Sequence, residues 1–310
     1  MKMYVGLTDY DWYKTLSQSK CEEVNFWRPG GNTNFRALDE GGLFLFKLHS
    51  PRDYIVGGGF FLKFSIIPSS LAWEAFGIAN GANSLTELNE RIYKYRKTNH
   101  FTDPDPQIGC IILSMPFYFD EEDWIPVPEN WSKTGIVQGK KYDTSEQYGL
   151  KLYHQLQGRI YKAQNSPPSI QDDSLNDRYG PERIVRPRIG QGAFKVLIAD
   201  AYHRRCAITG EKTLPVLEAA HIKPYSVDGP NDIRNGLLLR RDFHTLLDRG
   251  YITVDKSLTV EVSRRIKEDF GNGREYYAHH GKKLTIIPNK QDQLPDPKYL
   301  QWHNDNVFLG

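Results

Sequence analysis

Between Glu218 and Gly250 the chain places polar residues with possible catalytic roles among aliphatic ones, in the stretch EAAHIKPYSVDGPNDIRNGLLLRRDFHTLLDRG. The residues are His221, Asn235 and His244, with Asp248 one helical turn after His244. A histidine can act as a base near neutral pH, and a histidine and a carboxylate one helical turn apart can share a metal ion. A base and a cation together suit phosphodiester hydrolysis. Singly, each has an ordinary explanation, since an isolated histidine in an apolar strand is usually a core residue and an asparagine before glycine a turn residue.

The elements around these residues predict how they are positioned. LPVLEAAHI (214–222) predicts a strand, in which alternation puts Glu218 and Ala220 on one face and His221 on the other. KPYSVDGPNDIRN has strong loop signals, GLLL predicts a second short strand, and RRDFHTLLDRG a helix that ends at Gly250. A hairpin packed on this helix would bring the three candidate residues and Asp248 together.

This stretch resembles the His-Asn-His (HNH) motif of nucleases with the ββα-metal fold. YHRRCAITG (202–210), LEAAHIKPY, RNGLLL and FHTLLDRG are similar to HNH domains of bacterial restriction endonucleases, and so are the flanks RIGQGAFKVLIADAY (188–202) and LQWHNDNVF (300–308). The resemblance therefore covers about 188–310. It implies a metal-dependent DNA endonuclease that uses a divalent cation, Mg²⁺ first, with Mn²⁺ or another transition metal as alternatives.

The resemblance also implies roles for single residues. His221 corresponds to the general base, and His244 to a metal ligand. Asn235 corresponds to the central asparagine, which in some members orients the loop of the base and in others binds metal. Asp248 is where some members have a further ligand.

Two departures from the family pattern affect the metal site and the support of the domain. Many members have a metal ligand directly before the base, where this chain has Ala220, so we expect Glu218 to substitute for it. Members with a structural zinc carry paired cysteines, of which only Cys206 remains here. We therefore expect Cys206 to be buried in an apolar core.

The first part of the chain predicts an α+β domain. LFLFKL (43–48), GGFFLKFSII (58–67) and IGCIILSMPFYF (108–119) are typical of strands, and 86–97 of a helix. NFRALDEGGLFLFKLHSPRDYIVGGGFF (34–61) resembles the EVE and PUA-like fold, a curved small β-barrel with inserted helices. In restriction enzymes that join such a domain to an HNH domain, it recognises a modified cytosine extruded from the duplex.

A pocket for an extruded base needs aromatic faces and polar groups. Most aromatic residues of a β-rich domain are core residues, so only some of the candidates would line it. The candidates are Trp27, Asn32, Trp73, Phe76 and Asn80.

Contacts with the DNA backbone are expected from the segment 178–205, in which basic residues outnumber acidic ones. The candidates there are Arg186, Arg188, Arg204 and Arg205, and a solvated surface is an equally good explanation of this charge.

Segment composition predicts the domain organisation. Residues 146–162 predict a helix, and the following segment is rich in Pro, Ser, Asp and Asn. We therefore expect a recognition domain at 1–162, a linker at 163–187 and a nuclease domain at 188–310. A helix is predicted at 191–204, whereas the tail 284–308 has loop-like composition around an apolar strand.

Composition excludes several classes of protein. The 310 residues are 39% hydrophobic and 25% charged, with a mean hydropathy of −0.58. No apolar run is long enough for a membrane span, and the first residues, MKMYVGLTDYDWYK, are too polar for a signal peptide. We expect a cytoplasmic location. The three cysteines are far apart, which argues against a disulfide framework.

The sequence thus predicts a restriction endonuclease that cuts double-stranded DNA near 5-methylcytosine or 5-hydroxymethylcytosine. Because one HNH site cuts one strand, a homodimer is a possible partner arrangement. Two alternatives remain open: an HNH enzyme specific for an unmodified sequence, and a binding module for modified nucleic acid with a degenerate HNH scaffold.

Overall fold

The computed structural model describes residues 1–31, 34–96, 103–132, 138–165 and 189–310. It divides into two compact units, Met1–Gly190 (unit 1) and Gln191–Gly310 (unit 2). Both contain helices and strands, which confirms the α+β class. The predicted linker, 163–187, lies largely outside the described residues. The predicted domain boundaries therefore stay predictions.

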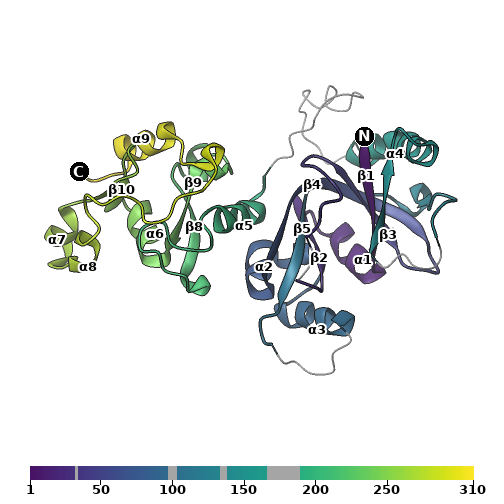
Figure 1. Cartoon of the computed structure of the whole chain (residues 1–310), viewed down its shortest axis with the longest axis horizontal. Helices are drawn as coiled ribbons and strands as arrows, with labels where there is room; N and C mark the ends of the chain where they lie inside the picture. Colours follow the sequence, from purple (N-terminus) through teal and green to yellow (C-terminus); the bar gives the residue numbers. More distant parts are fainter. Residues whose placement is uncertain (32–33, 97–102, 133–137, 166–188) are drawn as a thin grey trace. The chain divides into compact units, whose positions relative to one another are not determined.

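Unit 1 is built on one mixed sheet (Figure 1). Among the described residues its strands run in the order β2-β5-β4-β3-β1-β7, with β6 paired to β4. β1 and β3 are parallel, and the other pairs are antiparallel. The strands are β1 (Lys2–Thr8), β2 (Glu23–Arg28), β3 (Leu43–Leu48), β4 (Tyr54–Pro68), β5 (Gln107–Tyr118), β6 (Ile125–Pro126) and β7 (Gly139–Asp143).

For the described strands of unit 1, the word barrel fits the expected curved sheet only loosely. β2 and β7 stand at the two ends of the order of described strands, so this sheet is open rather than closed. Register shifts between Phe46 and Lys47 and between Gly58 and Phe60 interrupt the ladders, and such irregularities bend strands.

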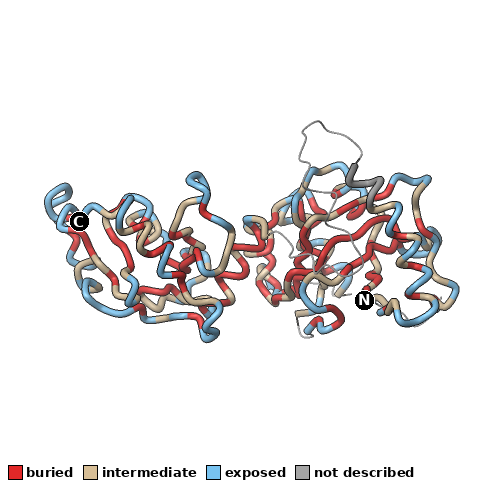
Figure 2. Tube along the Cα trace, turned by 90° about the horizontal axis from the view of Figure 1, so that it is seen from above, coloured by how far each residue is buried: buried red, intermediate tan, exposed pale blue. Residues whose placement is uncertain are grey.

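The strands of this sheet are largely buried (Figure 2), and apolar clusters pack against both of its faces. Along β3, Phe44 and Phe46 pack with Trp12 and Leu16 on one side, while Leu43 and Leu45 join a second cluster that includes Leu152 of α4. This is the alternation expected of a strand buried on both faces. The helices of unit 1 are α1 (Tyr10–Gln18), α2 (Ser69–Phe76), α3 (Leu85–Arg96) and α4 (Gln147–Asn165), with short 3₁₀ turns η1 (Gly77–Asn80) and η2 (Glu121–Asp123).

Unit 2 consists of two small hairpins surrounded by helices (Figure 1). The first hairpin pairs β8 with β9, and the second pairs β10 with β11. Its elements are α5 (Gln191–Ala201), β8 (Leu217–His221), β9 (Gly236–Arg240), α6 (Arg241–Asp248), β10 (Ile252–Val254), β11 (Val260–Val262), α7 (Arg265–Phe270), α8 (Arg274–Tyr277) and α9 (Pro297–Asn306), with 3₁₀ turns η3 (Leu214–Val216), η4 (Tyr225–Val227), η5 (Ile233–Asn235) and η6 (Gln291–Gln293).

Two predictions for unit 2 need correction. The strand expected at 214–222 starts only at Leu217, because 214–216 form η3 with a proline inside it. The tail, expected to be loop-like around a strand, contains α9. Asp296 caps this helix by accepting from Lys298 N, Pro297 is in its first turn, and the buried side chains of Tyr299, Leu300 and His303 recur at helical spacing.

His303 fixes α9 to the rest of unit 2. Its imidazole is 2% exposed. Its Nε2 donates to the carbonyl oxygen of Leu247 in α6 at 3.0 Å, and its Nδ1 accepts from the Thr253 hydroxyl of β10 at 2.8 Å. Both ring nitrogens are therefore satisfied with the ring neutral. Burial lowers the pKa of His303, although the carbonyl of Leu247 and the charge of Asp248 oppose this effect.

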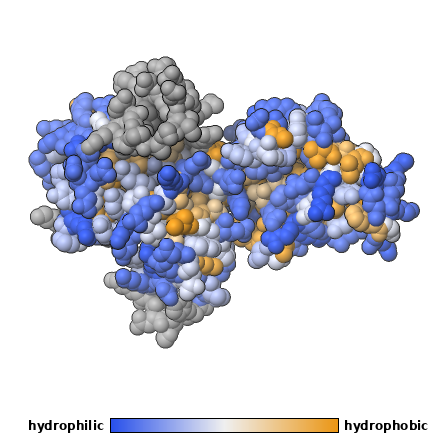
Figure 3. All heavy atoms as spheres, turned by 180° about the vertical axis from the view of Figure 1, so that it is seen from behind, coloured by the Kyte–Doolittle hydropathy of each residue, from blue (hydrophilic) through white to orange (hydrophobic). Residues whose placement is uncertain are grey.

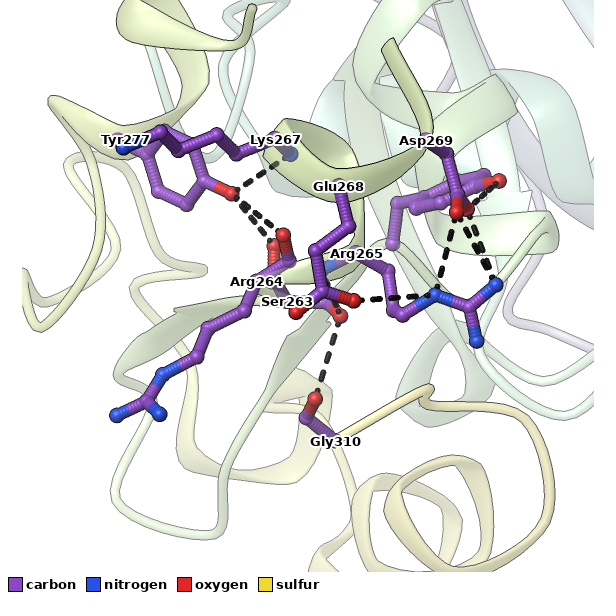
Figure 4. Close-up of polar contacts among 9 residues, drawn as sticks. Ser263, Arg264, Arg265, Lys267, Glu268, Asp269, Tyr277 and Gly310 are labelled. Carbon is purple, nitrogen blue, oxygen red and sulfur yellow. Dashed lines mark hydrogen bonds and ion pairs between the residues drawn. The ribbon is translucent and has the colours of Figure 1, made fainter. Parts of the chain in front are cut away.

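A polar cluster holds the chain around α7 (Figure 4). Arg265 pairs with Asp269 at 3.1 Å, and the Tyr277 hydroxyl donates to the carbonyl of Ser263 at 3.0 Å while it accepts from Lys267 N. The Ser263 hydroxyl donates to the carbonyl of Gly310. The second hairpin, α7 and α8 are thereby joined without a disulfide, since all three cysteines are free.

Figure 3 shows hydrophilic residues over most of the visible face, with apolar residues confined to small patches. Of the helices in the described residues, none is long and apolar enough to cross a membrane.

The glycines of β4 allow a close approach between strands. A Cβ on Gly58 would lie 2.5 Å from the Phe44 carbonyl oxygen and 2.7 Å from the Phe117 ring. We predict that Gly58→Ala destabilises unit 1 by about 1–3 kcal/mol through overpacking. The control Gly30→Ala, with open space around its Cβ, should change stability by less than about 0.5 kcal/mol.

Urea denaturation followed by tryptophan fluorescence measures this effect, because five of the six tryptophans belong to unit 1: Trp12, Trp27, Trp73, Trp124 and Trp131. Equal midpoints for the Gly58 and Gly30 variants would contradict the prediction.

The buried His303 predicts a pH dependence of stability. Its pKa in the folded protein is lower than the value of about 6.5 in an unfolded chain. The unfolded chain therefore binds more protons below pH 6.5, and folding stability falls as the pH decreases from 6.5 towards the folded pKa. We predict that His303→Gln is less stable than wild type at pH 7.5 but loses less stability between pH 7.5 and 5.5. Urea denaturation at both pH values is the measurement, and equal losses in the two proteins would contradict it.

Candidate nuclease site

The first hairpin of unit 2 and α6 form a continuous frame. β8 and β9 are antiparallel, with His221 opposite Gly236 and Leu217 opposite Arg240. α6 starts at the residue after β9 and ends before Gly250, whose φ of +74° suits glycine. A Cβ on Gly250 would also collide with the carbonyl oxygen of Val307 at 2.0 Å. The predicted strand, loop, strand and helix are thus confirmed.

His221 ends β8 and is held on two sides. Its ring stacks on Phe194 of α5, with the centroids 4.0 Å apart and the planes at 10°. Its Nε2 lies 2.9 Å from Oδ1 of Asn231. With this amide oxygen facing the ring, Nε2 carries the proton and Nδ1 keeps its lone pair. The stacking and the hydrogen bond together fix the orientation of the imidazole.

The surroundings of His221 keep it neutral. Burial lowers its pKa, the hydrogen bond with Asn231 opposes this, and the charges of His244 and Asp248 act with opposite signs. The charges of both α6 residues therefore act on His221. A half-buried, neutral imidazole at physiological pH is suited to accept a proton.

Asn235 closes the loop between the two strands. The residue is fully buried. Its Oδ1 accepts from Lys223 N at 2.9 Å, and its Nδ2 donates to the carbonyl oxygens of Lys223 and Pro230 at 2.9 and 3.0 Å. Since backbone atoms occupy both ends of the amide, Asn235 holds the loop that carries Asn231, and its arrangement does not fit a metal ligand.

His244 lies between two carboxylates. Its Nδ1 is 2.8 Å from Oε2 of Glu218 in β8, and its Nε2 is 3.4 Å from Oδ2 of Asp248. The other oxygen of Glu218 accepts from Arg241 Nε at 2.7 Å. Burial alone would raise the pKa of Glu218, but the hydrogen bonds from His244 and Arg241 hold it below its usual value. Glu218 is therefore an ionised partner of α6.

The donors around His244 fit a divalent cation only in part. The described residues contain no group of three or more His, Cys, Asp or Glu side chains that could hold a metal ion. A nitrogen of His244 and the carboxylate of Asp248, which is 53% exposed, are donors that such cations accept. Water and a phosphate of the substrate would have to complete the coordination. Ala220 contributes nothing, because it is buried opposite Leu237.

The remaining candidates of unit 2 have structural contacts. Arg204 pairs with Asp200 one turn earlier at 3.4 Å, and Arg205 donates to the carbonyl of Gly210. Cys206 is buried as expected, and its sulfur accepts from backbone amides. Arg186 and Arg188 lie outside the described residues.

Unit 1 contains a separate cavity of about 380 Å³. Its polar side is a chain of contacts in which the Tyr95 hydroxyl donates to Asp9, and His49 Nε2 lies 3.9 Å from the same carboxylate. Trp27 meets Tyr95 edge to face at 6.1 Å and donates to the carbonyl of Asn80. The lining residues are Tyr4, Leu7, Thr8, Asp9, Trp12, Phe26, Trp27, Arg28, Pro29, His49, Arg91, Tyr95, Ile111 and Gln138.

Of the four predicted pocket residues that the structure describes, one lines this cavity. Trp27 lines it. Asn80 is buried behind it, where its side chain contacts Asn25 and the carbonyl groups of Ala72 and Gly77. Phe76 is buried in the core, and neither Phe76 nor Trp73 is among the residues that line this cavity. Asn32 lies outside the described residues.

Several residues of the two sites were not singled out from the sequence. Asn231 belongs to a run, NDIRN, that predicts a turn and nothing more. Phe194 falls in the helix expected at 191–204, and no local pattern links it to His221. Asp9, His49 and Tyr95 are far apart in sequence, and only the sheet brings them together. A signal for Asn231 existed, because an amide in the loop after a strand histidine can reach that histidine.

Comparison with known proteins agrees with this geometry. Residues 206–255 match the HNH_2 family model, described as HNH endonuclease. No curated protein matches the chain.

Two solved structures were aligned with the chain. The crystal structure of ASCH from Zymomonas mobilis aligns at 10% identity and a TM-score of 0.32, covering 49% of this chain and 94% of that chain. The modification-dependent TagI restriction endonuclease aligns at 12% identity and a TM-score of 0.29, covering 97% and 81%. TM-scores of this size do not establish a shared fold.

The matched segment spans the first hairpin, the loop locked by Asn235 and the whole of α6. It also holds His221 and His244. Residues 206–255 therefore form an HNH endonuclease domain.

Proposed function

We propose that this chain is a modification-dependent restriction endonuclease, which hydrolyses DNA near a modified cytosine bound in unit 1. One observation supports the proposal above others. The unit without the nuclease site has a cavity that combines aromatic faces with a carboxylate, Asp9, which accepts from the Tyr95 hydroxyl and is still 40% exposed. A nuclease domain has no need of such a cavity, whereas a reader of single bases does.

The hydrolytic step is assigned to His221. Its imidazole would take a proton from water as the water oxygen attacks phosphorus and the bond to the leaving oxygen breaks. Phe194 and Asn231 keep the ring from turning away during this transfer. Held by His244 and Asp248, a divalent cation, with Mg²⁺ the first candidate, would stabilise charge on the phosphate and on the leaving oxygen. Mn²⁺ or another transition metal could serve in its place.

The recognition step is assigned to the cavity of unit 1. A flipped base would stack on aromatic rings such as Trp27, and Asp9 would accept a hydrogen bond from an exocyclic amino group. Cytosine has this amino group at N4, whereas thymine has a carbonyl oxygen at the equivalent position. This acceptor would favour cytosine over thymine, and the proposed base is 5-methylcytosine or 5-hydroxymethylcytosine. Since one site cuts one strand, a double-strand break needs two protomers or two successive cuts.

Cleavage assays test the overall proposal. Plasmid DNA with modified cytosine should be cut in the presence of Mg²⁺, while unmodified plasmid should remain intact and EDTA should stop the reaction. His221→Ala should lower the rate by about 100- to 10,000-fold, because the proton acceptor is lost. His154→Ala, at an exposed histidine of α4, should have no effect.

Two results would count against the proposal in different ways. Equal cutting of both plasmids would refute modification dependence and favour an enzyme for unmodified DNA. Undiminished cutting by the His221 variant would refute its role as base.

Binding assays test the cavity separately from catalysis. We predict that Asp9→Ala and Trp27→Ala each weaken binding of a duplex containing one modified cytosine about tenfold or more, because a hydrogen bond or a stacking surface worth about 1–3 kcal/mol is lost. Asp11→Ala is the control, because it removes an exposed carboxylate from the first turn of α1, two residues after Asp9, that does not line the cavity. Fluorescence polarisation with labelled duplexes is the measurement. If Asp9→Ala binds as tightly as Asp11→Ala, the cavity does not read the base.

A further inference from the structure

Glu218 uses both of its carboxylate oxygens on α6. Oε2 lies 2.8 Å from Nδ1 of His244, and Oε1 accepts from Arg241 Nε at 2.7 Å. An ionised carboxylate can only accept, so Nδ1 of His244 must donate and carry the ring proton. The lone pair of the neutral ring then belongs to Nε2, the nitrogen that faces Asp248 at 3.4 Å.

The exposure of the three side chains points in the same direction. Glu218 is 28% exposed and His244 23%, whereas Asp248 is 53% exposed. The accessible side of His244 is therefore the side of Nε2 and Asp248, not the side of Glu218. Glu218 is also fixed by its strand, since it pairs in register with Leu239 of β9.

We propose that Glu218 is a positioning residue and not the substitute metal ligand that the sequence suggested. It would hold His244 in the tautomer with Nε2 available, so that both protein donors to a cation, His244 Nε2 and the Asp248 carboxylate, come from α6. A carboxylate behind a ligating histidine fixes the ring and raises its basicity. β8 then does not have to supply a metal ligand in place of the one that is missing at Ala220. This inference rests on the proposed metal-dependent function.

The tautomer of His244 can be measured without any metal. Long-range ¹H–¹⁵N NMR of the full chain, at a pH where the ring is neutral and with His244→Gln to assign the signal, should show the proton on Nδ1. Glu218→Ala should move the proton towards Nε2, and Glu218→Gln, which keeps an acceptor oxygen, should restore Nδ1–H in part. Asp242→Asn is the control, because Asp242 is also on α6 and paired with an arginine, Arg240. A wild-type proton on Nε2, or no change in Glu218→Ala, would overturn the proposal.

Mn²⁺ titration, followed by the EPR signal of the free ion, distinguishes a positioning residue from a ligand. Glu218→Gln and Glu218→Ala should weaken Mn²⁺ binding about 10- to 100-fold with the stoichiometry unchanged. Asp248→Asn should reduce binding more strongly than either, and Asp242→Asn should not reduce it. Greater loss in Glu218→Gln than in Asp248→Asn would identify Glu218 as the ligand. If wild type binds no Mn²⁺, the proposed metal-dependent function fails, while the NMR result still decides the role of Glu218.

Discussion

The nuclease site depends on one buried amide. Asn235 satisfies backbone groups of Lys223 and Pro230 from inside the loop that joins β8 and β9. An unsatisfied buried polar group costs about 1–3 kcal/mol, so this loop has one favourable closed form. Asn231, which orients His221, lies in that loop, and α6, which carries His244, follows directly from the second strand. A single side chain thus couples the geometry of the base to that of the helix opposite.

Apolar packing provides the rest of the frame. Leu237, Leu238 and Leu239 of β9 are buried, and Phe243 and Leu247 form the inner side of α6. His244 and Asp248 lie on the other side of the same helix, close to the surface. Their polar groups therefore avoid the desolvation that full burial would impose. The aliphatic sequence around the two histidines is the support of the site, which explains why residues with core and catalytic character alternate so closely.

Local signals predicted the elements that carry the nuclease motif well and their surroundings less well. The hairpin and the end of α6 at Gly250 depend on turn chemistry and helical spacing within about 30 residues, whereas the roles of His221, Asn235 and His244 come from the resemblance to the HNH motif and stay predictions. α9 could have been predicted too, from the Asp-Pro start at 296–297, but proline-rich flanks suggested a loop. The openness of the sheet could not be predicted from local signals, because strand order is a long-range property. The same holds for the cavity, where β1, α3 and the β3–β4 loop contribute side chains that no local pattern links.

The stacking of His221 on Phe194 also determines how small a working nuclease fragment can be. Phe194 belongs to α5, which precedes the segment 206–255 that matches the family model. At the other end, α9 is bonded to α6 through His303, again from outside that segment. A fragment limited to residues 206–255 would keep every residue of the motif. It would lose α5 and α9, which contact His221 of β8 and Leu247 of α6. The smallest autonomous nuclease is therefore to be sought in 191–310, and engineering that transplants only the motif would transfer the chemistry without its support.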